Sequence, residues 1–300
     1  MAMTRSQFTS LLVEGLREVF FNTYKEPNLI YQKIFDVQKS NKYQEVRLGV
    51  AGLGMLAPKG EAEPIVYEDA TQGYTATFTH NAFAKGIQIS RELIDDELYG
   101  VMKQMTKALA RAGERRVEYD HASIFNNATS TAYTGADGLP LLSASHTYAA
   151  LPGETWSNTS ASTDLSLTAL SQAFNAMRRY RDDKGQIIML TPRTLLIPPE
   201  LEMTAYEILN SVGKPYTADN EVNFFKGKLD VVVWNYLTDT NAWFVLCDKS
   251  EIAPVSFQRI PMEFDRDTDF ETDVLRIKAY TRYSLGWDDA RFIYGSMGSS

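Results

Sequence analysis

The chain has 300 residues, of which 44% are hydrophobic, 23% charged and 12% aromatic. This composition is that of a globular protein and excludes disordered and fibrous classes. The length suffices for one large domain or two smaller ones. The formal net charge of −8 argues against a surface that binds nucleic-acid phosphates everywhere, but it is compatible with a local basic patch.

Cysteine usage and the lack of long apolar runs restrict the compartment. The single cysteine, Cys247 in WFVLCD, cannot form an internal disulfide and is best interpreted as a buried strand residue. Charged residues interrupt the N-terminal segment, so no signal peptide is predicted. No run approaches the ~20 apolar residues that span a bilayer. We therefore expect a soluble protein made inside a cell, with no membrane partner.

The first third of the chain predicts a helix followed by a long hairpin. Apolar side chains recur at helical spacing over residues 6–25, until Pro27 ends the pattern, and residues 31–38 are strand-like. Strand-like runs then flank the glycine- and proline-rich segment GLGMLAPKGEAEP. Residues 42–86 therefore predict one hairpin with a broad tip and few large apolar side chains.

The middle of the chain predicts two helices and a long loop. Ser90 is a candidate N-cap for a short helix, and a long helix is expected from Val101 to Phe125. Its basic residues lie away from its apolar stripe, which favours a solvated face over a face that contacts nucleic acid. Residues 126–164 form a loop so long that we expect it to be functional or ordered by a partner.

The last part of the chain mixes helices and strands. Helices are predicted over residues 165–180 and in PPELEMTAYEIL. Strands are predicted in IIMLTPRTLLIPP, LDVVVWNY, AWFVLCD, PVSFQRI, VLRIKAYTRYSL and ARFIYG. The order is not the regular alternation of parallel α/β proteins, so the fold class is α+β.

Three motifs suggest ligand sites but lack the context that such sites need. GLGMLA matches a dinucleotide fingerprint, but Pro58 and Pro64 prevent the helix that it requires. DRDTDFETD begins like a calcium loop, but its sixth position is Phe270 and its twelfth is Arg276, so a solvated acidic loop is favoured. The three histidines are scattered, which makes a zinc site improbable. No metal or cofactor is expected.

The segment DGLPLLSASHTY brings Asp137, Ser143, Ser145 and His146 within a few residues of one another. These residue types compose nucleophilic triads, but the chain lacks the G-x-S-x-G turn of α/β-hydrolases. Residues so close on one loop do not readily face each other. We interpret the segment as an architectural loop at a subunit contact, with its leucines seeking a partner surface.

Five segments, in their order along the chain, resemble the major capsid proteins of tailed phages, especially the Mu-like major head subunits. They are AGERRVEYDHASIFNNA, DGLPLLSASH, LTALSQAFNAMRRYRDDKG, TPRTLLIPPELEMTAYEIL and TRYSLGWDDARFIYG. The order carries more weight than any one segment, since short motifs often match by chance.

The resemblance implies the phage major capsid (Johnson) fold and divides the chain accordingly. The parts are an N-terminal arm (1–40), an extended hairpin loop (41–86), a peripheral domain with a long spine helix (87–164), an axial domain (165–250) and a return to the peripheral domain (251–300).

The function implied is that of a non-enzymatic capsid subunit. It assembles with itself as hexamers and pentamers of an icosahedral shell around double-stranded DNA, which it contacts non-specifically. Separate scaffolding, portal and decoration proteins are the other implied partners. Assembly in the bacterial host cytoplasm and residence in the virion capsid are implied with them. An encapsulin-type nanocompartment and a Ser/His hydrolase remain the alternatives.

Residue-level reasoning also favours an assembly. Ordering an exposed hairpin costs on the order of 1–2 kcal/mol per residue in backbone entropy, so a neighbour must stabilise it. The candidate subunit contacts are Phe8, Leu12, Phe20, Met55, Leu56, Pro58, Lys59, Leu139, Leu141, Leu142 and His146. Some relatives cross-link a loop lysine to a neighbour's asparagine. Lys59 is the candidate here, although no partner glutamate is identified and a solvated lysine is favoured.

Overall fold

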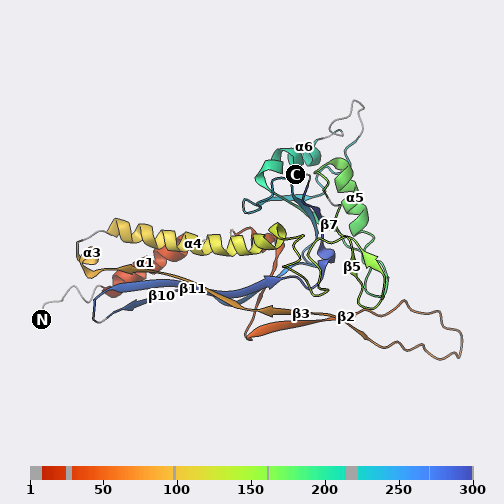
Figure 1. The fold of residues 1–300 in the computed structure, drawn as a ribbon, viewed down its shortest axis with the longest axis horizontal. Helices are drawn as coiled ribbons and strands as arrows, with labels where there is room; N and C mark the ends of the chain where they lie inside the picture. Colours follow the sequence, from red (N-terminus) through yellow and green to blue (C-terminus); the bar gives the residue numbers. More distant parts are fainter. Residues whose placement is uncertain are drawn as a thin grey trace.

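The computed structural model describes residues 9–24, 29–96, 99–160, 162–211, 213, 222–269 and 271–298. Figure 1 shows an elongated subunit with three parts. A long body of strands and helices carries a second group of strands and helices at one end, and a thin hairpin tip extends beyond both. The α+β class expected from the sequence is confirmed.

The long body is built on a four-stranded sheet in the order β1-β10-β11-β4. Its strands are β1 (Asp36–Lys39), β4 (Asn81–Ile89), β10 (Val255–Thr268) and β11 (Leu275–Gly286). The antiparallel β10–β11 pair runs from Val255 opposite Gly286 to Thr268 opposite Leu275. Buried residues alternate with more exposed ones along most of β11, as in a sheet that has one covered face.

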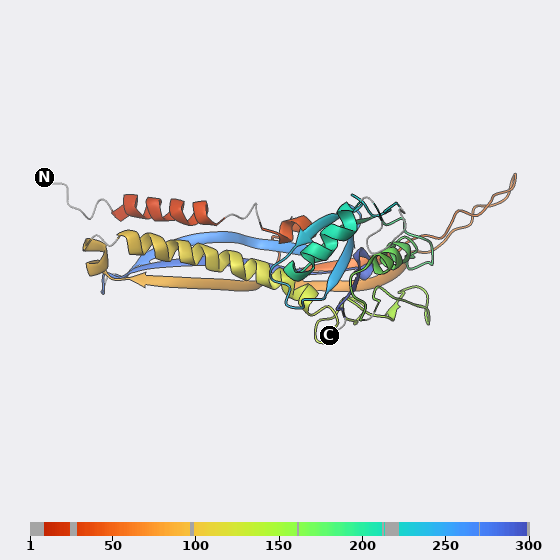
Figure 2. The ribbon, with the colours of Figure 1, turned by 90° about the horizontal axis from the view of Figure 1, so that it is seen from above.

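Two helices cover that face. The 28-residue helix α4 (Tyr99–Asn126) and the helix α1 (Thr9–Thr23) lie side by side on the same side of the strands (Figures 1 and 2). Apolar residues of both helices share one core with strand residues, and the ring centroids of Phe20 and Phe264 lie 4.9 Å apart. The apolar stripe of α1 therefore finds its groove within the same subunit.

The hairpin consists of β2 (Gln44–Ala51) and β3 (Thr71–Thr79), which pair antiparallel from Gln44 opposite Thr79 to Ala51 opposite Thr71. Residues 52–70 form the tip and contain no helix or strand. The strand-like run that follows the tip is divided at His80. Its first part, β3, pairs with β2, and its second part, β4, pairs with β11. Residues 81–86 thus belong to the sheet of the long body, contrary to the expectation of one hairpin over 42–86.

A second four-stranded sheet, in the order β12-β9-β7-β8, forms the other group. Its strands are β7 (Pro192–Ile197), β8 (Asp230–Val233), β9 (Trp243–Cys247) and β12 (Ile293–Ser296). Its helices are α5 (Leu167–Met177), the 3₁₀ turn η3 (Pro199–Leu201) and α6 (Glu202–Asn210). All five residues of β9 are buried, as in a strand covered on both faces.

The last strand corrects the expected course of the tail. Residues 251–300 were expected to return to the peripheral domain, but β12 pairs antiparallel with β9 in the second sheet. Only β10 and β11 of this range lie in the first sheet. A short 3₁₀ turn, η4 (Ala290–Phe292), lies between β11 and β12.

Shorter elements complete the chain. Residues 31–38, expected to be a strand, form a helical turn α2 (Tyr31–Ile34) before β1 begins. The helix α3 (Arg91–Asp95) is capped as predicted, because the Ser90 hydroxyl accepts a hydrogen bond from the Leu93 amide. The long loop after α4 contains only the two-residue strands β5 (His146–Thr147) and β6 (Thr155–Trp156).

Candidate assembly surfaces and the serine–histidine segment

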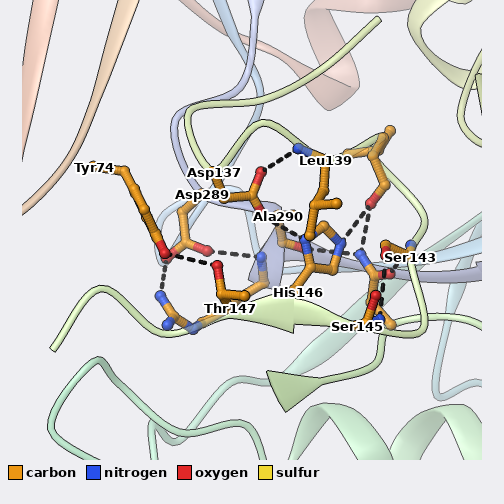
Figure 3. Close-up of polar contacts among 12 residues, drawn as sticks. Tyr74, Asp137, Leu139, Ser143, Ser145, His146, Thr147, Asp289 and Ala290 are labelled. Atoms are coloured by element: carbon orange, nitrogen blue, oxygen red, sulfur yellow. Dashed lines mark hydrogen bonds and ion pairs between the residues drawn. The ribbon is translucent and has the colours of Figure 1, made fainter. Parts of the chain in front are cut away.

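The segment around His146 is folded into the interior of its own chain. His146 has 0% exposure and its Nδ1 lies 2.6 Å from Asp137 Oδ2, while Nε2 faces the Leu141 carbonyl oxygen at 3.3 Å. Its ring stacks on Trp156 at a centroid distance of 4.6 Å. Figure 3 shows the polar contacts of His146 within the loop. Both ring nitrogens are thus engaged without a serine.

The two serines of the segment bond elsewhere. The Ser145 amide donates to Ser143 Oγ at 3.2 Å, and the Ser143 amide donates to the Asn158 side-chain oxygen at 2.9 Å. Asn158 in turn donates to the Leu141 carbonyl oxygen at 2.7 Å. A nucleophile and its base must lie within hydrogen-bond reach, and no serine of this segment has that relation to His146. The hydrogen bonds close a loop and assemble no triad.

The other two histidines form serine pairs that sequence reasoning missed. His121 Nε2 lies 2.8 Å from Ser256 Oγ, and His121 Nδ1 lies 2.7 Å from the Val117 carbonyl oxygen. Burial lowers the pKa of His121 from 6.5 to about 4. Both members of this pair are buried in the core, so they connect α4 to β10 and offer no surface to a substrate.

His80 has the same architectural character. Its two ring nitrogens lie 3.0 Å from Ser40 Oγ and 2.9 Å from Ser284 Oγ. The pKa of His80 is lowered, first by burial and then by the charge of Arg282. The residue stands between β3 and β4, where the chain leaves the hairpin, so it fastens that junction to the ends of β1 and β11.

A buried carboxylate joins three distant segments. Glu118 of α4 accepts hydrogen bonds from the Ile30 and Tyr31 amides and from the Trp234 indole nitrogen, the last at 2.5 Å. Desolvation raises the pKa of Glu118, although these donors oppose the shift. The three donors come from the start of α2 and from the segment after β8, which no short motif could have placed beside α4.

The hairpin carries a group of apolar residues that the described part of the subunit leaves uncovered. Met55 is 81% exposed and Leu56 is 99% exposed, and Pro58 and Lys59 are also exposed. Further exposed apolar residues of the hairpin are Val46, Leu48, Val50, Leu53, Ile65, Val66 and Tyr67. An isolated apolar surface of this kind marks an interaction site.

Contacts with the rest of the chain hold the hairpin on both sides of its outermost part. Lys184 Nζ lies 2.8 Å from Glu68 Oε1, and the Gln186 side-chain amide donates to the Leu53 carbonyl oxygen at 3.0 Å. Tyr74 and Thr147 share a hydroxyl hydrogen bond of 2.7 Å (Figure 3). The tip from Met55 to Ile65 has no comparable contact with the described remainder of the chain.

Four expected contact residues are buried in their own subunit, so their side chains face its core. Phe20 packs against Phe264, and Leu141 and Leu142 lie in the main core with His146 beside them. The long loop folds back on itself, so its leucines need no partner surface. Leu139 is half-buried. Phe8 lies outside the described residues, and the side chain of Leu12 does too.

A second exposed apolar group lies on and beside α6 and was missed. Its members are Met203, Tyr206, Val222 and Phe224. The sequence PPELEMTAYEIL did predict a helix, and Ala205, Ile208 and Leu209 form its buried face. The signal that could have revealed this surface was the presence of Met203 and Tyr206 on the opposite face.

The structure also decides the remaining motifs. Within the described ranges, no group of three or more His, Cys, Asp or Glu side chains is placed to hold a metal ion. Asp265 and Asp267 lie in strand β10 rather than in an acidic loop, and Asp265 pairs with Lys278 at 3.6 Å. Cys247 is buried in β9, and burial raises the pKa of its thiol to about 12. No helix in the described part of the chain is both long and apolar enough to cross a bilayer.

Solved structures share this architecture. Similar chains include the capsid of the cyanophage P-SCSP1u, with a TM-score of 0.59, 12% identity and coverage of 91% of this chain and 88% of that chain. The structure of Microbacterium phage Oxtober96 gives a TM-score of 0.56, 10% identity and 90% coverage of both chains. The procapsid of bacteriophage JBD30 gives 0.51, 13% identity and coverage of 98% and 76%. The fold is therefore that of phage capsid subunits, as the resemblance implied.

The sequence profile of the family described as "Phage capsid protein" matches residues 73–296, which is more than half of the chain. The chain belongs to this phage capsid protein family. Comparison with curated proteins gave no match. The profile does not separate Mu-like head subunits from other phage capsid proteins, so the Mu-like assignment stays a prediction.

Proposed function

We propose that the protein is the major head subunit of a tailed phage or prophage, and that its copies assemble as hexamers and pentamers into an icosahedral shell around double-stranded DNA. The uncovered hairpin tip carries this proposal. An apolar tip from Met55 to Ile65 that its own chain does not cover is stable only against another molecule. The simplest such molecule is a second copy of the chain.

The candidate contacts that stay accessible belong to this proposal. Met55, Leu56, Pro58 and Lys59 at the tip are the proposed contacts to a neighbouring copy. We assign residues 41–79 to the extended loop and the sheet with α4 to the peripheral domain. The second sheet with α5 and α6 is the proposed axial domain, and the exposed residues of α6 suit contacts at the centre of a capsomer.

The proposed partners follow from this role. Scaffolding, portal and decoration proteins are separate chains, and assembly takes place in the cytoplasm of the bacterial host before the subunit enters the virion. The subunit has no catalytic role. The serine and histidine geometry supports this, since no serine of the DGLPLLSASHTY segment lies on a ring nitrogen of His146.

The test replaces residues 55–65 with a short glycine–serine linker and leaves β2 and β3 intact. We expect folded, unassembled subunits and no shells in negative-stain micrographs, because the tip stabilises the contact between copies. Shells of normal size from this variant would contradict the proposal. The contents of wild-type particles separate the alternatives, since packaged DNA fits a phage head and a protein cargo fits an encapsulin-type compartment.

A further inference from the structure

A row of cations runs along the outer side of α4. Lys103, Lys107, Arg111 and Arg115 are all exposed, and each lies four residues from the next. None of them forms an ion pair with any residue that the structure describes. Arg116, by contrast, lies with its Nη2 2.8 Å from Asp120 Oδ1 and stacks on Phe83. We call the four residues the basic row.

The basic row does not stabilise the helix that carries it. Side chains four residues apart on a helix are neighbours, so the row contains three repulsive pairs in succession. Between Tyr99 and Arg116 the helix has a single acidic residue, Glu114. In a chain whose formal net charge is −8, this concentration of unpaired positive charge calls for an external anion.

The opposite face of the same sheet carries different charges. Glu263, Asp265 and Asp267 alternate along β10, and β11 places Lys278 opposite Asp265 and Arg276 opposite Asp267. Lys278 lies 3.6 Å from Asp265, and Arg276 lies 2.6 Å from Asp269. The positive charges of Arg276 and Lys278 are thus offset within the subunit, whereas those of the basic row are not. The helix α4, which carries the row, covers the other side of the sheet (Figure 1).

The spacing of the basic row suits a phosphate backbone. From Lys103 to Arg115 the helix rises about 18 Å, at ~1.5 Å per residue. Phosphates follow one another at about 3.4 Å along each strand of B-DNA, so a rod of this length can lie against several of them. Contacts of this kind recognise no sequence, as packaging of any DNA requires.

We propose that the helix-covered face of the long body is the inner wall of the shell, and that the basic row contacts the phosphates of the packaged double-stranded DNA. This inference rests on the proposed function. The bare sheet face, with its carboxylates, is then the outer side of the wall. The row is the local basic patch that the acidic net charge permits.

The first test measures the salt dependence of binding between unassembled subunits and a short DNA duplex of arbitrary sequence. The variant carries Lys103→Gln, Lys107→Gln, Arg111→Gln and Arg115→Gln, since glutamine keeps high helix propensity. Loss of four phosphate contacts reduces the magnitude of the negative slope of log K against log salt by about 3 to 4. The double variant Lys107→Gln with Arg111→Gln is the milder version and lowers it by about 2.

The matched control is Arg276→Gln with Lys278→Gln, which removes two exposed positive charges from the bare face and should leave the slope unchanged. A slope unchanged in the row variants, or lowered equally by the control, would overturn the assignment. Folding of each variant is checked by helix content in circular dichroism.

The second test uses DNA-filled wild-type particles and formaldehyde, which joins lysine amines to DNA bases. We expect cross-linked peptides that contain Lys103 or Lys107 and none that contain Lys278. Filled particles without cross-links to the α4 lysines would overturn the inner-wall assignment while leaving the proposed function intact. Wild-type particles that never contain DNA would instead refute the proposed function.

Discussion

At the scale of single residues, the environment of His146 shows how a group that resembles catalytic chemistry serves the fold. The ring is enclosed by Asp137, the Leu141 carbonyl oxygen and the Trp156 ring, so it holds a long loop in one conformation. The sequence revealed which residue types meet, because they are close along the chain. It did not reveal that the loop turns inward, which depends on Asn158 fifteen residues after Ser143.

The Asp137→Asn variant tests that role. Asparagine keeps only one acceptor oxygen, so it cannot accept from both the Leu139 amide and His146 as the carboxylate does. We therefore expect a loss of about 1–3 kcal/mol in the free energy of unfolding. Urea unfolding of the unassembled subunit measures it. Ser145→Ala is the control and should change stability by less than about 0.5 kcal/mol. Ester hydrolysis that depends on Ser145 would contradict the structural interpretation.

The buried His121 predicts an acid-sensitive core. The unfolded chain binds a proton at His121 near pH 6.5, whereas the lowered pKa keeps the folded side chain neutral down to about 4. Its contribution to stability is therefore complete above pH 6.5 and is lost as the pH falls toward 4. The loss amounts to about 3 kcal/mol. Glu118 and Asp120 next to it have raised pKa values, and their contributions have the opposite sign.

The measurement is the free energy of unfolding as a function of pH for the wild type and for His121→Gln. We expect the variant to be less stable at pH 7 but to lose less stability between pH 6.5 and 4. Parallel pH profiles of the two proteins would contradict the prediction, because they would mean that folding does not change the pH at which His121 binds its proton.

At the scale of elements, helices and strands with strong periodicity were predictable, and their partners were not. The helices α1 and α4 and most strands match the expected segments. Residues 31–34 were expected to be extended, but Glu118 holds the Ile30 and Tyr31 amides from 87 or more residues away. Likewise, the β-rich run after the tip gave no sign that it changes sheets at His80, because both halves alternate in the same way.

Two glycines predict opposite responses to substitution by alanine. A Cβ at Gly295 in β12 would lie 2.6 Å from Phe244 Cδ1 and 2.9 Å from the Trp243 carbonyl oxygen. We expect Gly295→Ala to cost about 1–3 kcal/mol. Gly15 lies on the exposed side of α1, and nothing lies within 4 Å of a Cβ added there. We expect Gly15→Ala to stabilise the helix by about 0.5–1 kcal/mol. Thermal unfolding of both variants compares the two directions, and equal effects would contradict the packing argument.

At the scale of the whole molecule, the uncovered tip separates folding from assembly. The double variant Met55→Ser with Leu56→Ser removes apolar side chains that touch little of their own subunit. We expect its free energy of unfolding to match that of the wild type, because these residues are already in water. We expect its yield of shells in sedimentation and electron microscopy to fall by tenfold or more, as for the loss of a buried apolar contact.

Glu61→Ala at the same tip is the matched control, because Glu61 is exposed but is not among the proposed contacts, and its shell yield should be unchanged. A double variant that assembles like the wild type would show that the tip is not a contact between copies.

The sequence indicated this surface through its glycine- and proline-rich composition. It could not show that Leu141 and Leu142, equally apolar and also in a loop, would be buried.

The two sheets interleave along the chain. The first sheet combines β1 and β4 from the first third of the chain with β10 and β11 from its last part. The second sheet is complete only when β12 joins β9. Neither sheet can be completed by a nascent chain until the ribosome has translated the last strands. A copy truncated before Ile293 keeps the pairing of β9 with β7 but lacks β12, so one edge of that apolar strand is unpaired. We expect such unfinished products to be degraded rather than built into a shell.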